Sequence, residues 1–259
     1  MKGHGEAAIV VEDLTAEYDG DIVLENVSFE VYRGEIFLLL GESGCGKTTA
    51  FRYMLGLYRA HRGRVLVNGV DMTMATEDEL MALRLKLGML FQSNALLGSM
   101  TLYENVALPL KEHTDLPEDI VRDIVRMKLG MVNLAGYDNH LPSELSGGMQ
   151  KRAGIARAMA LDPEFLFLDE PSAGLDPITA AELDYLIKNI NESMGVTLII
   201  VTQELDSIFN IGHRCVMFDK KEKGIIATGA PRDLKENSQD DRVLSFFNRR
   251  IPGTAGRAA

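Results

Sequence analysis

Short apolar runs alternate with longer segments of helical spacing along most of the chain. This alternation is typical of an α/β domain with a largely parallel sheet that is buried on both faces. Six runs are expected to be strands: EIFLLL (35–40), RVLVNG (64–69), LGMLFQ (87–92), EFLFLD (164–169), VTLIIVT (196–202) and RCVMFD (214–219). Helical patterns follow where crossover helices belong, at 47–57, 178–190 and 204–212.

Near the start of the chain the pattern changes, and apolar residues alternate with polar ones in AIVVEDL (7–13) and VLENVSFEVY (23–32). A period of two is typical of strands that bury only one face, so both segments are expected to form a small antiparallel side sheet. A further segment, FDKKEKGIIATG (218–229), is expected to form a hairpin around Gly224.

No convincing strand pattern occurs between Ser93 and Ala160, where residues 115–136 carry apolar side chains at helical spacing and Pro117 suits a first turn. We therefore expect three parts. These are an α/β core made of residues 1–92 and 161–230, an inserted helical subdomain at 93–160, and a C-terminal tail at 231–259.

Composition narrows the class of protein. Of the 259 residues, 46% are hydrophobic and 25% are charged, which is ordinary for a globular protein and excludes intrinsic disorder. The longest apolar stretches, at 36–40 and 198–201, are far shorter than the roughly 18 residues of a membrane-spanning helix. The first dozen residues show no secretory signal, and Cys45 and Cys215 are too few and too distant for a disulfide framework. A cytoplasmic protein with reduced thiols is expected.

The chain carries 38 acidic and 27 basic side chains, a formal net charge of −11. General nucleic-acid binding needs a basic surface that neutralises phosphates, so no nucleic-acid partner is expected. Any phosphate ligand must therefore be bound by a local sequence motif and not by a general basic surface.

Such a motif occurs at GESGCGKT (41–48), which has the spacing GxxxxGK[ST] between a buried strand and a helix. Glycines let the loop turn its backbone N–H groups towards phosphate oxygens, and the helix adds its positive N-terminal end. Lys47 is expected to bridge the β- and γ-phosphates of ATP, and Thr48 to hold Mg²⁺. The dinucleotide pattern GxGxxG fails, because Thr49 stands at its last position. The expected nucleotide contacts are Gly41, Glu42, Ser43, Gly44, Cys45, Gly46, Lys47, Thr48 and Thr49.

Two carboxylates follow another buried run, in EFLFLDE (164–170). Asp169 can hold Mg²⁺ through water, and Glu170 can polarise the attacking water as a general base. The phosphate loop alone indicates nucleotide binding, whereas the loop and this pair together favour hydrolysis.

A second candidate anion site lies in LPSELSGGMQKR (141–152), where Ser146, Gly147 and Gly148 precede a helical run. One nucleotide does not need two phosphate sites on one chain. The segment resembles the signature of the ATP-binding cassette (ABC) family, LSGGQ, which reads LSGGM here with Met149 in fifth place and Gln150 one position later.

Other motifs support the resemblance in family order and at family-like spacing. Tyr18 matches the aromatic residue that stacks on adenine, although a turn aromatic is an alternative. Gln92 matches the glutamine between the core and the helical subdomain, where the resemblance implies a Mg²⁺ contact; a solvated amide is the alternative. Asp176, in SAGLD (172–176), matches the loop that crosses the dimer.

The resemblance implies a P-loop NTPase (RecA-like) α/β core with an antiparallel β side sheet and an inserted α-helical subdomain. It also implies a head-to-tail homodimer, in which each ATP lies between Lys47 of one copy and Ser146 of the other, with hydrolysis driving membrane partners. The chain departs from the family at Gln203, where a histidine usually contacts the γ-phosphate. Glutamine keeps an N–H donor but carries no proton or positive charge to the phosphate. Our hypothesis is that hydrolysis persists; the alternative is a slow-turnover nucleotide-sensing dimer.

A narrower resemblance, to ATPases of maintenance-of-lipid-asymmetry (Mla) and mammalian-cell-entry (MCE) systems, rests on segments such as LFQSNALLGSMTLYENVALPLKEHT and DEPSAGLDPIT. It implies phospholipid transport in bacteria from the cytoplasmic face of the inner membrane. The implied partners are an integral membrane permease, an MCE-domain protein and a small STAS-type regulatory subunit. ATPases of amino-acid importers or of lipoprotein release are the alternatives.

The tail segment DDRVLSFFNRR (240–250) places apolar side chains beside arginines. It could dock on the paired cassette, on a regulatory subunit or on the membrane surface. The alternative is a short amphipathic end that packs on its own domain.

Overall fold

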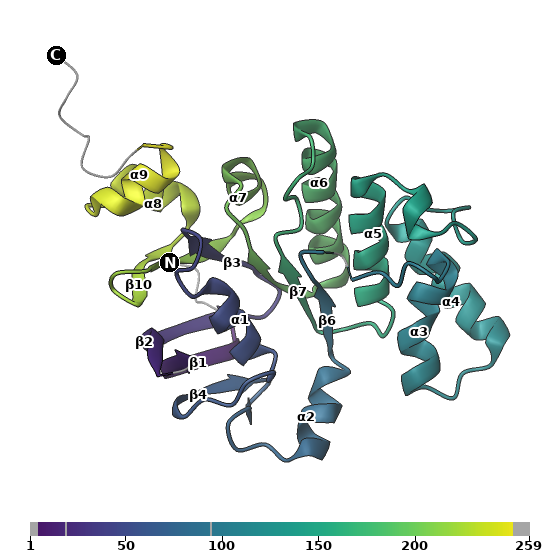
Figure 1. Ribbon diagram of the computed structural model, residues 1–259, viewed down its shortest axis with the longest axis horizontal. Coiled ribbons are helices and arrows are strands. Elements are labelled where there is room, and N and C mark those ends of the chain that lie inside the picture. The colour runs from purple at the N-terminus through teal and green to yellow at the C-terminus, as the bar shows by residue number, and fades with distance from the viewer. Residues whose placement is uncertain (1–4, 19, 94, 251–259) are drawn as a thin grey trace. The chain divides into compact units, whose positions relative to one another are not determined.

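The computed structural model describes residues 5–18, 20–93 and 95–250, and leaves out the side chain of Tyr18 (Figure 1). The chain divides into two compact units. The first consists of Met1–Thr76 with Val201–Ala259, and the second is Glu77–Ile200.

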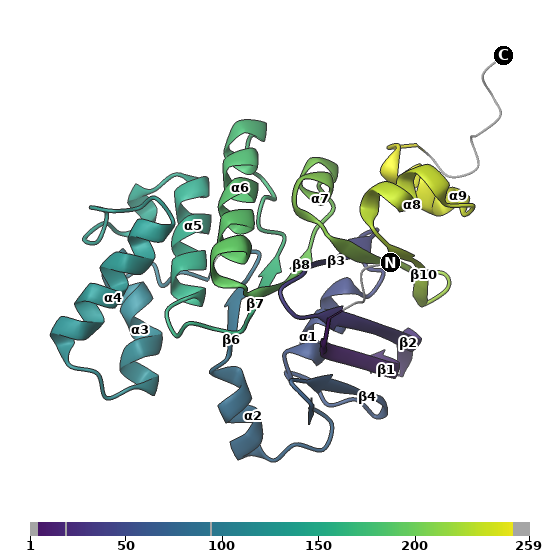
Figure 2. The same ribbon diagram turned by 180° about the vertical axis from the view of Figure 1, so that it is seen from behind.

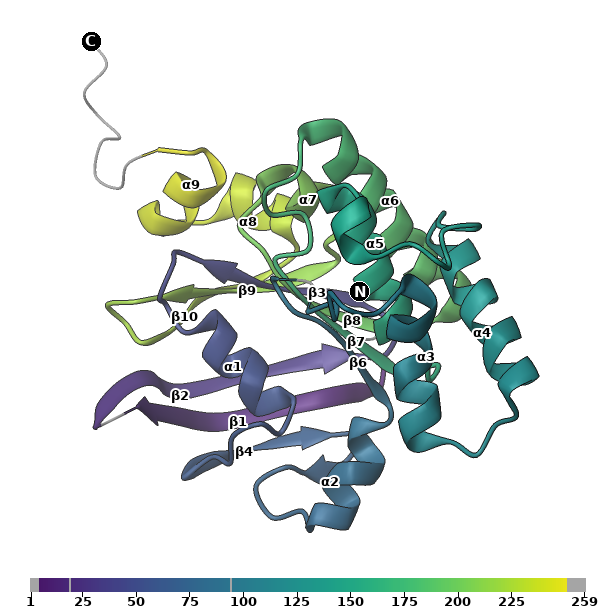
Figure 3. The same ribbon diagram turned by 45° about the vertical axis from the view of Figure 1, so that its right-hand side comes forward.

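An antiparallel sheet in the first unit has the strand order β2-β1-β4-β5. β1 (Ala7–Tyr18) and β2 (Asp21–Tyr32) form the predicted antiparallel pair, and β5 (Val70–Asp71) pairs with β4 (Arg62–Val67). The helix α1 (Lys47–Met54) lies over this sheet (Figure 3).

The strand expected at 64–69 is confirmed as part of β4, but it pairs antiparallel with β1 and does not join the parallel sheet. The polar start of β4 explains the difference. Arg62, Gly63 and Arg64 are exposed, while Val65 and Val67 are buried. Such a half-exposed strand suits an antiparallel sheet with one solvated face.

Three further strands of the first unit are hydrogen-bonded in the order β10-β9-β3. β3 (Ile36–Gly41) is buried along its whole length and runs parallel to β9 (Arg214–Asp219). β9 and β10 (Gly224–Gly229) form the predicted hairpin, and α7 (Leu205–Ile211) confirms the helix expected at 204–212.

In the second unit, β6 (Leu87–Leu90) and β7 (Phe165–Asp169) are parallel, and β8 (Thr197–Val201) is next in order. The expected helix at 178–190 is longer, forming α6 (Pro177–Met194). The helix α2 (Glu77–Arg84) was missed, because only Leu80 and Leu83 of its eight residues are buried and the apolar spacing is too short to read.

The part of the chain at 95–160 is largely helical, as its apolar spacing predicts. It holds α3 (Leu102–His113), α4 (Glu118–Met131), a 3₁₀ turn (Pro142–Glu144) and α5 (Gly147–Ala158), which pack together (Figures 1 and 2). Thr101 and Glu104 cap the start of α3 reciprocally, which satisfies backbone N–H groups that the first turn leaves unpaired.

After β10 the chain forms α8 (Pro231–Asn237) and α9 (Asp241–Phe247). Val243 and Phe247 of α9 are buried, and the rings of Phe247 and Phe209 lie 5.6 Å apart. Arg242 forms ion pairs with Asp219 and Glu222 at the end of β9 and the turn that follows. The tail segment therefore packs on its own unit, which is the amphipathic end considered as the alternative.

None of the helices in residues 5–18, 20–93 and 95–250 is long and apolar enough to span a membrane. Cys45 and Cys215 are both buried, and each carries a free thiol.

Candidate functional site

The phosphate loop connects the end of β3 to the start of α1. Gly41 ends the strand with a φ of +135°, and Gly46 precedes the helix with a φ of +104°. Lys47 is buried, and its Nζ donates hydrogen bonds to the carbonyl oxygens of Gly41 at 2.7 Å and Glu42 at 2.8 Å. The loop thus wraps around the lysine ammonium, with the N-terminus of α1 at its end.

Close packing explains why glycine occupies positions 41 and 46 of the phosphate loop. A Cβ on Gly41 would lie 2.4 Å from the backbone oxygen of Phe218, in β9. A Cβ on Gly46 would lie 2.4 Å from Cδ2 of Leu24, in β2. Both positions also have a positive φ, which L-residues rarely adopt. The sheets of the first unit therefore leave no room for side chains at these turns.

This packing predicts a selective loss of stability. We expect Gly41→Ala to lower the free energy of unfolding by about 3 kcal/mol or more, because the clash is with backbone and the φ is strained. Gly44→Ala is the matched control. Its φ is +74° but nothing lies within 4 Å of the added Cβ, so the expected cost is about 1 kcal/mol. Urea denaturation of the full chain measures both, and equal losses would contradict the packing argument.

The remaining loop residues differ in exposure. Glu42, Ser43 and Gly44 are exposed, whereas Thr48 and Thr49 are half-buried in the first turn of α1. Burial raises the pKa of the Cys45 thiol, and the nearby Lys47 opposes this rise. The neutral thiol is therefore favoured, which argues against a redox role for Cys45.

The predicted acidic pair lies at the end of β7, in the second unit. Asp169 is the last residue of the strand, and Glu170 follows it; both are half-buried. Glu170 has a φ of +49°, a conformation that is uncommon for a residue with a side chain. Its carbonyl oxygen accepts a hydrogen bond from the backbone N–H of Ala173 at 3.3 Å.

Sequence reasoning missed a residue beside this pair. Lys151 of α5 is 5% exposed, and its Nζ donates to the carbonyl oxygens of Gln92 at 2.7 Å and Glu170 at 3.3 Å. Burial lowers the pKa of Lys151, while the charges of Asp169 and Glu170 oppose that shift. A signal was available, because Lys151 lies at helical spacing from Gly148 and Ile155, whose small and apolar side chains indicate a buried face.

Gln92 lies in the turn after β6, with its side chain exposed. Its carbonyl oxygen receives the Lys151 hydrogen bond, so the backbone of this predicted metal contact is tied to α5.

The second candidate anion site lies at the start of α5. Ser146 is the N-cap residue, and its hydroxyl accepts a hydrogen bond from the Met149 N–H at 3.3 Å. Ser146 and Gly147 are exposed, while Gly148 is buried, and a Cβ on it would lie 2.4 Å from Cγ2 of Thr179. Exposed N–H groups at a helix start suit an anion.

The loop that contains Asp176 leads into α6, whose first turn packs against the start of α5. Asp176 caps α6 by accepting hydrogen bonds from the N–H groups of Ile178 and Thr179, both at 3.1 Å. The Thr179 hydroxyl also donates to it at 2.6 Å, and these hydrogen bonds lower the pKa of Asp176. Since Thr179 also abuts Gly148, one residue connects the signature to this loop.

Gln150, displaced from its family position, has a structural role. Its Nε2 donates to the carbonyl oxygens of Pro142 at 3.0 Å and Leu145 at 3.3 Å. These bonds hold the 3₁₀ turn that leads into the signature.

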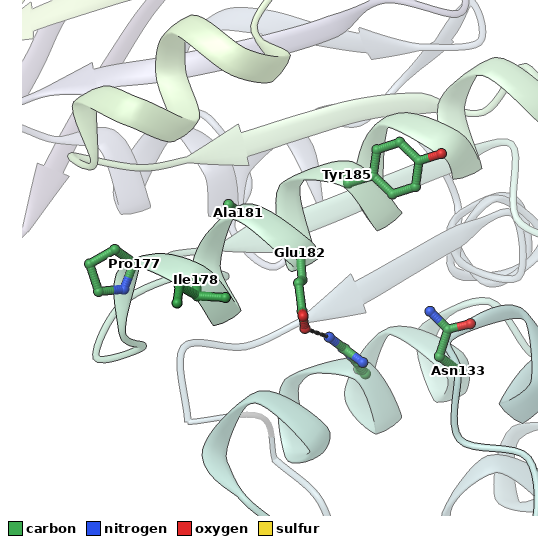
Figure 4. A pocket seen from close by; sticks show the side chains of 7 residues that line it. Asn133, Pro177, Ile178, Ala181, Glu182 and Tyr185 are labelled. Atoms are coloured by element: carbon green, nitrogen blue, oxygen red, sulfur yellow. Dashed lines mark hydrogen bonds and ion pairs between the residues drawn. The ribbon is translucent and has the colours of Figure 1, made fainter.

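A hollow of about 680 Å³ runs along α6 (Figure 4). Arg152 of α5 and Glu182 of α6 form an ion pair in it. Ile178 and Tyr185 are 74% and 69% exposed, and the remaining lining residues are Asn133, Pro177 and Ala181. Among the side chains that the structure describes, none of the predicted nucleotide contacts lines this hollow.

Gln203 and Tyr18 are the two other residues predicted for the nucleotide site. Gln203 follows β8 and is exposed. Tyr18 ends β1, but its side chain lies outside the described part of the chain.

The motifs of one family therefore occur in order on an α/β core and a helical segment. A family model described as ABC transporter matches residues 24–173. The chain belongs to the ABC transporter family.

Several members of the ABC transporter family resemble the chain over most of its length. The intermembrane phospholipid transport system ATP-binding protein MlaF of Haemophilus influenzae is 40% identical over 92% of this chain and 89% of its own. The probable ribonucleotide transport ATP-binding protein mkl of Mycobacterium leprae is 40% identical over 96% of this chain and 71% of its own.

Solved ABC cassettes share the fold. The cassette MJ0796, a dimer in a post-hydrolysis state bound to ADP and Pi, has a TM-score of 0.77 and 29% identity, covering 86% of this chain and 98% of its own. For cbiO1 from Clostridium perfringens, part of the ABC transporter complex cbiONQ, the TM-score is 0.81 and the identity 29%, covering 95% and 96%. The predicted fold class, a P-loop NTPase with an α-helical ABC subdomain, is confirmed.

Proposed function

We propose that the chain is the ATP-hydrolysing subunit of a bacterial ABC transporter that moves phospholipid across the cell envelope. The observation that carries this proposal is the 40% identity to MlaF, which extends over about nine-tenths of both chains. The relative mkl is equally identical and bears the name of a ribonucleotide transport protein. Ribonucleotide cargo is therefore the second candidate.

In this proposal, the ATP site combines residues from several motifs. The backbone of 41–46 and the Lys47 ammonium hold the phosphates, and Tyr18 stacks on adenine. Thr48, Gln92 and Asp169 supply hydroxyl, amide and carboxylate oxygens, which are the donors that Mg²⁺ prefers. The ion neutralises charge on the phosphates when bound.

Glu170 is proposed as the general base that orients and deprotonates the attacking water. Gln203 is proposed as a neutral N–H donor to the γ-phosphate. Such a donor supports hydrolysis without carrying a proton.

We also propose that two copies pair head to tail. Ser146, Gly147, Gly148 and Met149 of one copy then meet the nucleotide held by the other, and Asp176 lies at the seam. Support comes from the exposed helix start at Ser146 and from the dimer of the similar cassette MJ0796.

The proposed location is the cytoplasmic face of the inner membrane, bound to an integral membrane permease. An MCE-domain protein and a STAS-type subunit are the further proposed partners. The similarity to a phospholipid transport subunit supports this arrangement.

Gentle detergent extraction of the tagged chain tests the proposal. We expect co-purification of a permease and an MCE-domain protein. After reconstitution, the complex should move fluorescent phospholipid, but not a labelled ribonucleotide, in an ATP-dependent way. Transport of the ribonucleotide alone would favour the second candidate. An amino-acid-binding protein in place of the MCE-domain protein would overturn the lipid assignment.

A further inference from the structure

Lys151 occupies an unusual position for a lysine. It lies on the buried face of α5, three residues after Gly148 and with 5% of its surface exposed. Burying an ammonium costs several kcal/mol unless strong acceptors replace water. Methionine would fill a similar volume at lower desolvation cost, so packing alone does not explain a cation here.

The acceptors are two backbone carbonyls from different parts of the second unit. One belongs to Gln92, in the turn after β6, and the other to Glu170, after β7. A charged donor strengthens such hydrogen bonds. Lys151 therefore connects the signature helix to both segments.

The Glu170 backbone has particular need of such support. Its φ of +49° is strained for a residue with a side chain, and such a conformation persists only when its surroundings hold it. The Ala173 N–H and the Lys151 ammonium both donate to the Glu170 carbonyl, at 3.3 Å each. The direction in which the Glu170 carboxylate leaves the chain depends on this peptide orientation.

We propose that Lys151 is a positioning residue for ATP hydrolysis, which holds the Glu170 and Gln92 backbones in fixed register with the start of the signature helix. In this role Lys151 acts through the two carbonyl oxygens to which its Nζ donates. Because α5 begins at the signature, a displacement of this helix is transmitted to the general base. This role rests on the proposed hydrolysis.

Replacing Lys151 tests the role by separating turnover from nucleotide affinity. In the full chain with its co-purified membrane subunits, we expect Lys151→Met to lower kcat for phosphate release by about 10- to 100-fold, the worth of a charged hydrogen bond. The KM for ATP should change by less than about threefold, since the proposed role places the lysine ammonium on two backbone carbonyls and not on the nucleotide. Lys151→Gln, which keeps one donor group, should give an intermediate kcat and serves if the methionine variant does not fold.

Lys128→Met is the matched control. Lys128 is another buried lysine of the same unit, 1% exposed, and its ammonium pairs with Asp162, which is not a predicted site residue. Its replacement should reduce thermal stability and leave kcat of the folded protein within about twofold. Amide hydrogen exchange around Gln92 and Glu170 should rise in Lys151→Met and stay unchanged in Lys128→Met.

The outcomes are distinct. A wild-type kcat in Lys151→Met, equal losses in both lysine variants, or a raised KM with unchanged kcat would each overturn the positioning role while leaving the proposed function intact. Absence of ATP hydrolysis by the wild-type complex would overturn both.

Discussion

Replacing Glu170 with glutamine is expected to reduce phosphate release by about 10²- to 10⁴-fold, the usual contribution of a general base. Glutamine has nearly the same size but accepts no proton from water at neutral pH. The half-buried position at the end of β7 and the Lys151 hydrogen bond to the carbonyl should survive the change. ATP binding should therefore persist, and the ATP-bound dimer should accumulate.

Glu164→Gln is the matched control for this prediction. Glu164 precedes the same strand, and its carboxylate pairs with Lys86 at 2.9 Å. An exposed pair of this kind contributes little, so phosphate release should stay close to the wild-type rate. Phosphate release at saturating ATP measures both variants. A Glu170→Gln protein that retains wild-type turnover would remove Glu170 from the role of base.

Replacing Lys47 with alanine is expected to weaken nucleotide binding strongly, and not to slow turnover alone. The ammonium supplies a positive charge to the phosphates, and each charged hydrogen bond contributes about 1.5–3 kcal/mol. Its Nζ also donates to the carbonyls of Gly41 and Glu42, so the loop loses two internal hydrogen bonds. We expect the Kd for Mg²⁺-ATP to rise at least about a hundredfold.

Arg52→Ala is the control for Lys47. Arg52 belongs to the same helix, is exposed, and donates to the Tyr58 hydroxyl at 3.3 Å, away from the loop. Its replacement should leave the Kd for ATP unchanged, as measured by equilibrium binding of a fluorescent ATP analogue. Wild-type affinity in Lys47→Ala would contradict the assignment of this loop to the phosphates.

The two variants also separate the two halves of the proposed mechanism. Glu170→Gln should bind ATP without hydrolysing it, whereas Lys47→Ala should bind ATP only weakly. If both variants lost binding equally, Glu170 would have to contact the nucleotide rather than the water.

Motifs whose conformation depends only on adjacent residues could be predicted well from the sequence. Residues 41–48 turn from a buried strand into a helix because glycine spacing and the adjacent apolar run determine that geometry locally. Ser146 caps α5 for the same reason, since an N-cap depends only on the next three residues. The hairpin of β9 and β10 also follows from local turn chemistry.

The neighbour of a strand in a sheet and the presence of a short helix were harder to predict. The pattern of 64–69 indicates a strand, but not that β1 is its neighbour. Strand pairing depends on which sheet edges are available in the folded chain. An apolar run of this length does not indicate which strand will be its neighbour. The short helix α2 was missed because eight residues hold too few apolar positions to define a period.

By itself, the sequence determined the family, the phosphate loop, the acidic pair and the signature, because each is a short motif with local geometry. Only the tertiary structure showed which residues from distant parts of the chain pack against those motifs. The oxygen of Phe218 excludes a side chain at Gly41, Thr179 abuts Gly148, and Lys151 reaches the carbonyls of Gln92 and Glu170. These contacts join residues 19 to 177 positions apart, and a pattern read along one dimension does not contain them because packing brings such segments together.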